Sequence, residues 1–109
     1  MTEPFKFNEF KKLELRVAEI VDAKPHPNAD RLYVLDLVVG GEKKQVVAGI
    51  KNHYAAAELI GKKVVVVNNL EPAVIRGVES QGMVLAASEG DKLTLVTPER
   101  EISSGAVVR

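Results

Sequence analysis

The side chains that most often carry catalysis or hold metal ions are scarce and scattered in this sequence. There is no cysteine, and the two histidines are His26, which lies between two prolines, and His53. Neither histidine has another at the spacing of metal ligands, so we expect no zinc site. No serine has the flanking glycines that expose a nucleophile, and the carboxylates show no close pair. We therefore predict a protein that is not an enzyme and that uses no metal ion and no cofactor.

Three patches of basic and polar residues indicate binding instead. They are residues 25–31, 43–52 and 76–83. Arginine and lysine neutralise phosphates, and each such contact makes binding sensitive to salt. Ser80 and Gln81 are able to hydrogen-bond a ribose, including the 2′-hydroxyl group that distinguishes RNA. Aromatic residues make up 5% of the chain, too few for a platform that stacks single strands, so shape and backbone recognition of a folded RNA fits better.

Short strands separated by turns must position these patches. Alternating or β-branched runs predict strands at residues 13–20, 32–39, 43–49, 62–68, 82–87, 93–97 and 105–109. Residues 52–60 predict a helix that ends at Gly61, and a slip of the alternation near Ala18 predicts a β-bulge. This order is that of an all-β OB-fold, a five-stranded Greek-key barrel with a short helix between strands three and four and extra terminal strands. The three patches should converge on the open side of that barrel.

Length and charge restrict the partners. The 109 residues fit one domain, and 15 basic side chains balance 15 acidic ones. A net charge of zero argues against a protein that coats nucleic acid through bulk charge. Residues 24–76 hold eight basic and five acidic side chains, a net +3, so this part is expected to face an anion. No signal peptide or apolar run of membrane-spanning length is present, so we expect a cytoplasmic protein with no membrane partner.

Several segments have the order and spacing of a known family. They are residues 13–17, 26–32, 48–50, 69–72 and 76–87, and the most diagnostic is Ser-Gln-Gly-Met at residues 80–83. Together they resemble the tRNA-binding domain appended to methionyl-tRNA synthetases. That domain also occurs as a free-standing, structure-specific tRNA-binding protein and in EMAP II-like cytokine precursors. The resemblance spans nearly the whole chain, so residues 1–109 are read as one tRNA-binding OB-fold domain.

The resemblance implies what the domain does and with which partners. It implies a fold that grips the outer corner of L-shaped tRNA with little sequence preference. Members raise the tRNA affinity of a synthetase and do not perform aminoacylation. The expected partners are therefore tRNA, the catalytic chain of methionyl-tRNA synthetase and a second copy of this chain.

The resemblance also implies which side chains contact tRNA. They are Arg31, Lys44, Ser80 and Met83, joined by Asn28, Lys51, Arg76 and Gln81. The residues themselves leave simpler alternatives open. Met83 begins an apolar strand and could be a core residue, and Arg31 could pair with Asp30 or Asp36. Asp30 is predicted to pin its loop by accepting backbone hydrogen bonds and not to contact RNA, because a carboxylate repels phosphate, and His26 is predicted to shape that loop.

Apolar residues at both ends of the chain exceed what a five-stranded barrel needs. They could cover the end of the barrel or form a twofold interface, and together with the resemblance we predict a homodimer. The interface residues would be Phe7, Phe10, Leu93, Leu95, Ile102 and Val107. Two alternative functions stay open. One is a chaperone-like OB protein of the same superfamily that binds unfolded polypeptide, and the other is a pure dimerisation module of the synthetase.

Overall fold

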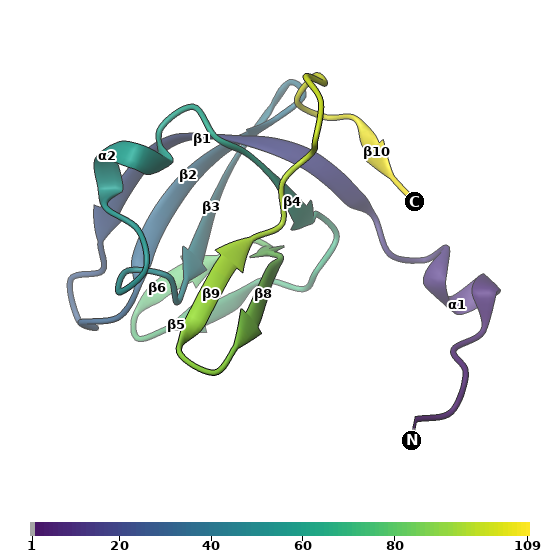
Figure 1. The fold of residues 1–109 in the computed structure, drawn as a ribbon, viewed down its shortest axis with the longest axis horizontal. Helices are drawn as coiled ribbons and strands as arrows, with labels where there is room; N and C mark the ends of the chain where they lie inside the picture. Colours follow the sequence, from purple (N-terminus) through teal and green to yellow (C-terminus); the bar gives the residue numbers. More distant parts are fainter. Residues whose placement is uncertain (1) are drawn as a thin grey trace.

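The largest element of the structure, a computed structural model that describes residues 2–109, is one strongly curved antiparallel sheet (Figure 1). Its main strands are hydrogen-bonded in the order β3-β2-β1-β4-β7. Their bounds are β1 (Leu15–Pro25), β2 (Tyr33–Val39), β3 (Glu42–Ala48), β4 (Lys63–Val67) and β7 (Met83–Val84). The long strand β1 pairs with β4 through residues 15–19 and with β2 through residues 19–25. Because one strand serves both neighbours, the sheet curls, and the predicted OB-type fold is confirmed.

A β-bulge bends β1, but it lies further along the chain than the sequence predicted. The register against β2 shifts between Ile20 and Asp22, and the intervening Val21 is exposed. The alternation slips earlier, near Ala18, because Val17 and Ala18 are both buried. A remote segment explains this burial, since the Val17 N–H donates to the Ala106 carbonyl and the Gly105 N–H donates to the Val17 carbonyl. Because both faces of β1 are covered at this point, two successive apolar residues are buried without a bulge. In the sequence this gives the same break in alternation as a bulge does.

The free edge of β3 is covered by a small hairpin, made of β5 (Ala73–Ile75) and β6 (Val78–Ser80). The side-chain amide of Gln45 donates to the Glu79 carbonyl at 2.8 Å. Directly after the hairpin, the Gln81 N–H donates to the Gln45 carbonyl at 2.8 Å. The edge of β3 is therefore covered by this hairpin, although it is not paired with it as a strand.

The core fills the inside of the curved sheet. Its largest fully buried side chains come from β1 to β4 and from the short helix α2 (Ala56–Leu59), and they are Ile20, Leu35, Leu37, Val46, Leu59, Val64 and Val66. All four valines of β4 are buried, as expected for a strand covered on both faces. Helix α2 is shorter than the predicted span of residues 52–60. It starts where the Glu58 carboxylate accepts the Ala55 N–H, and it is followed by Gly61 at a positive φ of 88°.

The C-terminal third adds a second hairpin and a last strand. The hairpin of β8 (Ala86–Glu89) and β9 (Lys92–Leu95) docks on the barrel where the Tyr54 hydroxyl accepts the Leu95 N–H at 3.0 Å. Strand β10 (Val107–Val108) pairs with the start of β1. Leu95 itself is 5% exposed and belongs to the hydrophobic core. Its predicted place in a dimer interface is therefore wrong, because its side chain already fills the barrel of its own chain.

The N-terminal helix α1 (Phe7–Phe10) stands away from the barrel, beyond the start of β1 (Figure 1). All four of its residues are exposed. Across residues 2–109, no helix is both long enough and apolar enough to cross a membrane.

Candidate nucleic-acid interface

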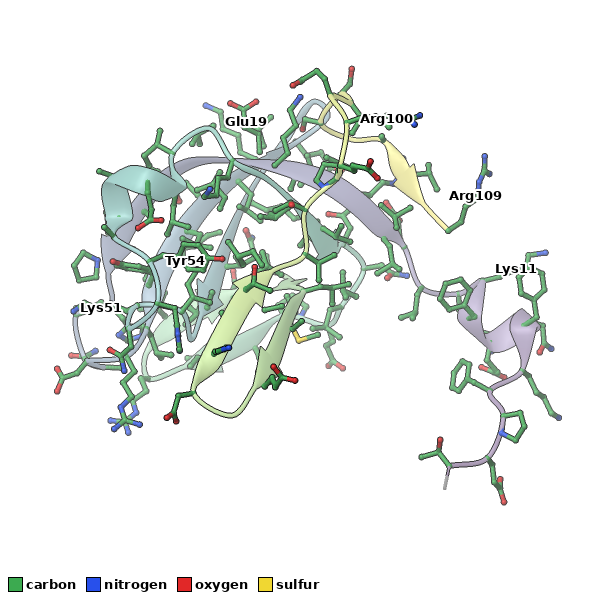
Figure 2. The ribbon with its side chains drawn as sticks, in the orientation of Figure 1. Lys11, Glu19, Lys51, Tyr54, Arg100 and Arg109 are labelled. Carbon is green, nitrogen blue, oxygen red and sulfur yellow. The ribbon has the colours of Figure 1, made fainter. Side chains whose placement is uncertain are left out.

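Three of the predicted contact residues meet in one hollow at an end of the barrel. Asn28, Arg31 and Arg76 line a space of about 400 Å³ together with Ala29, Asp30 and Leu32, and we call it the arginine hollow. Lys51 lies beside it, since its backbone N–H donates to the Arg31 carbonyl at 3.4 Å. Figure 2 shows Lys51 at the left edge of the molecule, next to the loop between β1 and β2. The loop between β1 and β2 and the turn of the β5–β6 hairpin thus bring together Arg31 and Arg76, which are 45 positions apart in the sequence.

A buried histidine holds the two walls of the arginine hollow together. His26 is 5% exposed, and its Nε2 lies 2.9 Å from the Ile75 carbonyl. Its Nδ1 accepts the Asn28 N–H at 2.9 Å, so in this arrangement Nε2 carries the proton and donates. The Asn28 side chain then donates to the Arg76 carbonyl at 3.1 Å. The predicted loop-shaping role of His26 is confirmed, and the hollow is fixed before any ligand arrives.

The charges in the arginine hollow are not paired with one another. In the described part of the chain, neither Arg31 nor Arg76 forms an ion pair, and the Asp30 carboxylate accepts no hydrogen bond. The alternative in which Arg31 pairs with Asp30 or Asp36 is therefore wrong. The alternative in which Asp30 pins its loop is also wrong, because His26 performs that task. Both guanidinium groups remain available to an external anion.

The turn that carries Arg76 is strained for an arginine. Arg76 has φ 51° and Gly77 has φ 89°, the signs of a two-residue hairpin turn with both central residues left-handed. Such turns favour Asn-Gly, and Arg76 is the one non-glycine residue at positive φ among residues 2–109. A disfavoured backbone at an exposed residue is a reason to look for a function of its side chain.

A second cluster of predicted residues lies around the end of β4. Lys44 and Gln81 line a hollow of about 410 Å³, together with Lys43 and Gln45, and we call it the lysine hollow. The Lys44 ammonium group donates to the Asn68 carbonyl at 2.6 Å, and Gln81 accepts the Gln45 N–H at 2.9 Å. These two hydrogen bonds hold the side chains of Lys44 and Gln81 at the rim of the lysine hollow.

Met83 belongs to the same neighbourhood, because it pairs with Val67, the last residue of β4. Its side chain is 48% exposed. The alternative in which Met83 is a core residue is therefore wrong, and its thioether is free to contact a ligand.

Ser80 lies between the two hollows but does not face solvent. Its side chain is 4% exposed. Its hydroxyl group accepts the Val47 N–H at 2.9 Å and donates to the Gly82 carbonyl at 3.0 Å. This buried position does not fit the predicted contact with RNA. The side chain instead fastens β6, the strand that follows the turn of Arg76, to β3, the strand that carries Lys44. Lys44 and Val47 are three residues apart on β3, about 10 Å along the strand.

A polar network holds Asn68, whose backbone carbonyl accepts the Lys44 ammonium group. The Asn68 side-chain amide donates to Glu14, and the Arg16 guanidinium group also donates to that carboxylate. The hydrogen bond from Asn68, followed by the positive charge of Arg16, holds the pKa of the Glu14 carboxyl below its usual value. Glu14 therefore stays ionised, and Asn68 links it to Lys44 through its backbone carbonyl.

The remaining predicted interface residues lie apart from both hollows. Phe7, Phe10 and Val107 line an apolar groove of about 510 Å³ together with Leu13 and Val108, and we call it the terminal groove. Lys11 and Arg109 also border it, and Figure 2 shows both at the opposite end of the molecule from Lys51. Ile102 is exposed but does not line the terminal groove, and Leu93 is partly buried against the core.

Comparisons with known proteins identify the family of this chain. A family described as "Putative tRNA binding domain" matches residues 15–107. The methionine–tRNA ligase of Thermococcus kodakarensis is 52% identical over 103 residues, which cover 94% of this chain and 14% of that protein. The chain thus spans only a small part of that relative's length.

Solved structures share the whole fold. A protein from Pyrococcus horikoshii, described as related to MetRS, has a TM-score of 0.91 and 34% identity, covering 99% of this chain and 100% of that one. The chaperone CsaA of Bacillus anthracis has a TM-score of 0.89 and 28% identity, covering 98% and 100%. The resemblance inferred from the motifs is confirmed by sequence and by fold. The chain belongs to the family of tRNA-binding domains that includes the part of methionyl-tRNA synthetases it matches.

Proposed function

We propose that this chain is a noncatalytic domain that binds tRNA in the cytoplasm and supplies tRNA affinity to a methionyl-tRNA synthetase. The carrying observation is the arginine hollow, where Arg31 and Arg76 come from separate segments whose backbones are joined through His26, and where neither arginine forms an ion pair within residues 2–109. Unpaired guanidinium groups on backbone segments that are already joined are suited to phosphates, because only the side chains have to be ordered on binding. Membership of the family and the name of the Thermococcus relative support the same partner.

The two hollows suit the outer corner of a folded tRNA. Asn28, Arg31, Lys51 and Arg76 contact it from one side, and Lys44, Gln81 and Met83 from the other. The aromatic residues among residues 2–109 lie outside both hollows, at Phe5, Phe7, Phe10, Tyr33 and Tyr54. Base stacking on aromatic rings is therefore not the source of affinity, and recognition of shape and backbone is favoured.

A titration with folded tRNA, unfolded tRNA and duplex DNA tests this function. We expect the folded tRNA to bind most tightly, with affinity that falls as salt rises. The CsaA chaperone of similar fold motivates the competing function, binding of unfolded polypeptide. That function predicts suppression of aggregation that competing tRNA does not relieve. A pure dimerisation module predicts no tRNA binding at all.

We further propose that the terminal groove joins two copies of the chain. Phe7 is 72% exposed and Val107 is 55% exposed, an unusual amount of apolar surface on neighbouring segments. The groove lies at the far end from Lys51 (Figure 2), so pairing leaves the arginine hollow open. Two tRNA-binding surfaces on one particle then raise the avidity without a change in net charge.

Replacing both groove phenylalanines, Phe7→Asp with Phe10→Asp, is expected to convert the dimer into a monomer. The substitutions place two charges in an apolar interface, and the barrel stays folded because α1 is exposed on its own chain. Analytical ultracentrifugation at several concentrations measures the change. Ile60→Asp is the control, since Ile60 is 48% exposed but follows α2. Equal masses for all three proteins would contradict the interface.

The Arg76→Asn variant is expected to be more stable and to bind tRNA more weakly. Asparagine suits the left-handed backbone at φ 51°, so the free energy of unfolding rises by about 0.5 to 1 kcal/mol. Loss of one phosphate contact lowers the affinity by about fivefold near 0.15 M salt. Thermal unfolding and filter binding measure the two effects. Arg76→Ala serves as control, because it removes the charge without improving the turn. Unchanged tRNA affinity in both variants would remove Arg76 from the site.

A further inference from the structure

Asp30 is the residue of the arginine hollow whose presence phosphate binding does not explain. It lines the hollow with Arg31 and Arg76, yet its carboxylate makes no ion pair and accepts no hydrogen bond within residues 2–109. A free carboxylate repels phosphates and lowers the affinity of the surface for RNA. A hydrogen-bond donor of the RNA that faces the carboxylate would offset this cost.

The surroundings of Asp30 suit a flat ring in addition to a phosphate. Ala29 and Leu32 are half-buried and give the hollow an apolar lining. The planar guanidinium groups of Arg31 and Arg76 are able to stack on the face of a base. A volume of about 400 Å³ is in the range of sites that take small ring compounds.

The hollow is also rigid enough to select a ligand. Its walls are joined by the two hydrogen bonds of the buried His26 ring and by the bond from Asn28 to the Arg76 carbonyl. Asp30 lies two residues after Asn28, on the segment that these bonds hold. A carboxylate on a fixed loop discriminates between bases because the wrong base leaves polar groups unpaired.

We propose that the arginine hollow takes one unstacked guanine base of the bound RNA, with the Asp30 carboxylate accepting hydrogen bonds from the guanine N1–H and N2–H groups. Guanine is the base whose Watson–Crick edge presents two adjacent donors, and an ionised carboxylate has two acceptor oxygens. This inference rests on the proposed function for its RNA, and it adds a base contact to a surface otherwise matched to shape and backbone.

Binding of single nucleotides tests the pocket without tRNA. Titrations with 5′-GMP, 5′-IMP and 5′-AMP are followed through the backbone amide NMR signals of residues 28–32 and 76–77. We expect 5′-GMP to bind about tenfold more tightly than 5′-AMP, the scale of a two-bond base contact. 5′-IMP should lie between them, because it lacks the N2 amino group. In Asp30→Asn the preference should vanish, and the fold should persist because the side chain is exposed and makes no bond.

Binding of tRNA gives a second test in which charge and base contact predict opposite signs. Asp30→Asn removes one negative charge, which by itself strengthens RNA binding, but it also removes the guanine acceptor. We expect a net loss of about fivefold. Asp36→Asn is the matched control, since Asp36 lines the lysine hollow and likewise forms no ion pair across residues 2–109. It should strengthen tRNA binding by about twofold.

The outcomes separate this inference from the proposed function. Equal affinities for 5′-GMP and 5′-AMP, or a gain in tRNA affinity for Asp30→Asn like that of Asp36→Asn, would overturn the guanine site. Binding of tRNA that still depends on Arg31 would then leave the proposed function in place. A protein that selects 5′-GMP but does not bind folded tRNA would show the reverse, a base site on a domain with another partner.

Discussion

The double variant Arg31→Ala with Lys44→Ala is expected to bind folded tRNA about 25-fold more weakly than the unmodified chain near 0.15 M salt. Each lost phosphate contact reduces the affinity by about fivefold at this ionic strength, because nearly one counterion fewer is released. The two residues belong to different hollows, so their effects should multiply. The slope of log affinity against log salt should flatten by about 2. Filter binding between 50 and 300 mM potassium chloride measures both quantities.

A control with the same loss of charge distinguishes the two hollows from bulk electrostatics. Lys92 and Arg100 are exposed and lie outside both hollows. We expect Lys92→Ala with Arg100→Ala to change the tRNA affinity by less than about twofold. If the two double variants weaken binding equally, tRNA is attracted by net charge alone, and the assignment of the hollows is incorrect.

The Gly82→Ala variant is expected to lose about 2 kcal/mol of the free energy of unfolding. A Cβ atom at this position would lie 2.9 Å from the Val67 carbonyl oxygen and 3.3 Å from a methyl group of Val66. Both atoms belong to the buried strand β4, so the methyl group can be accommodated only by moving the segment of Gly82 itself. Chemical denaturation measures the loss.

The same substitution should also weaken tRNA binding, although Gly82 itself carries no charge. Its carbonyl accepts the Ser80 hydroxyl, and it stands between Gln81 and Met83, which we assign to the interface. Gly41→Ala is the matched control, because nothing lies within 4 Å of its Cβ position. A Gly82→Ala protein that is as stable as Gly41→Ala would contradict the close packing of this segment on β4.

Sequence reasoning succeeded for features that depend on neighbouring residues. Alternation identified β2 and β3, and Gly40-Gly41 identified the turn between them, since Val39 pairs with Glu42. It was less accurate where distant segments cover a strand or a side chain. The sequence pattern predicts the bulge near Ala18, whereas it lies at Val21, and it predicts Leu95 in an interface, whereas that side chain fills the core. In both cases the burial comes from residues far away in the chain.

The sequence by itself determined the order of β1 to β4, the OB-type fold and the membership of a tRNA-binding family, because strands, turns and motifs depend on short local patterns. It predicts no strand between residues 68 and 82, where the structure has the short β5–β6 hairpin against the edge of β3. Only the tertiary structure decided which polar side chains are free to act. It buries Ser80 against Val47, and it joins His26 to Ile75, 49 residues away. Within residues 2–109 it also leaves Arg31 and Asp30 without an ion pair in one hollow. Hydrogen bonds and ion pairs between side chains depend on which distant segments of the chain come into contact. Only the folding of the whole barrel decides those contacts.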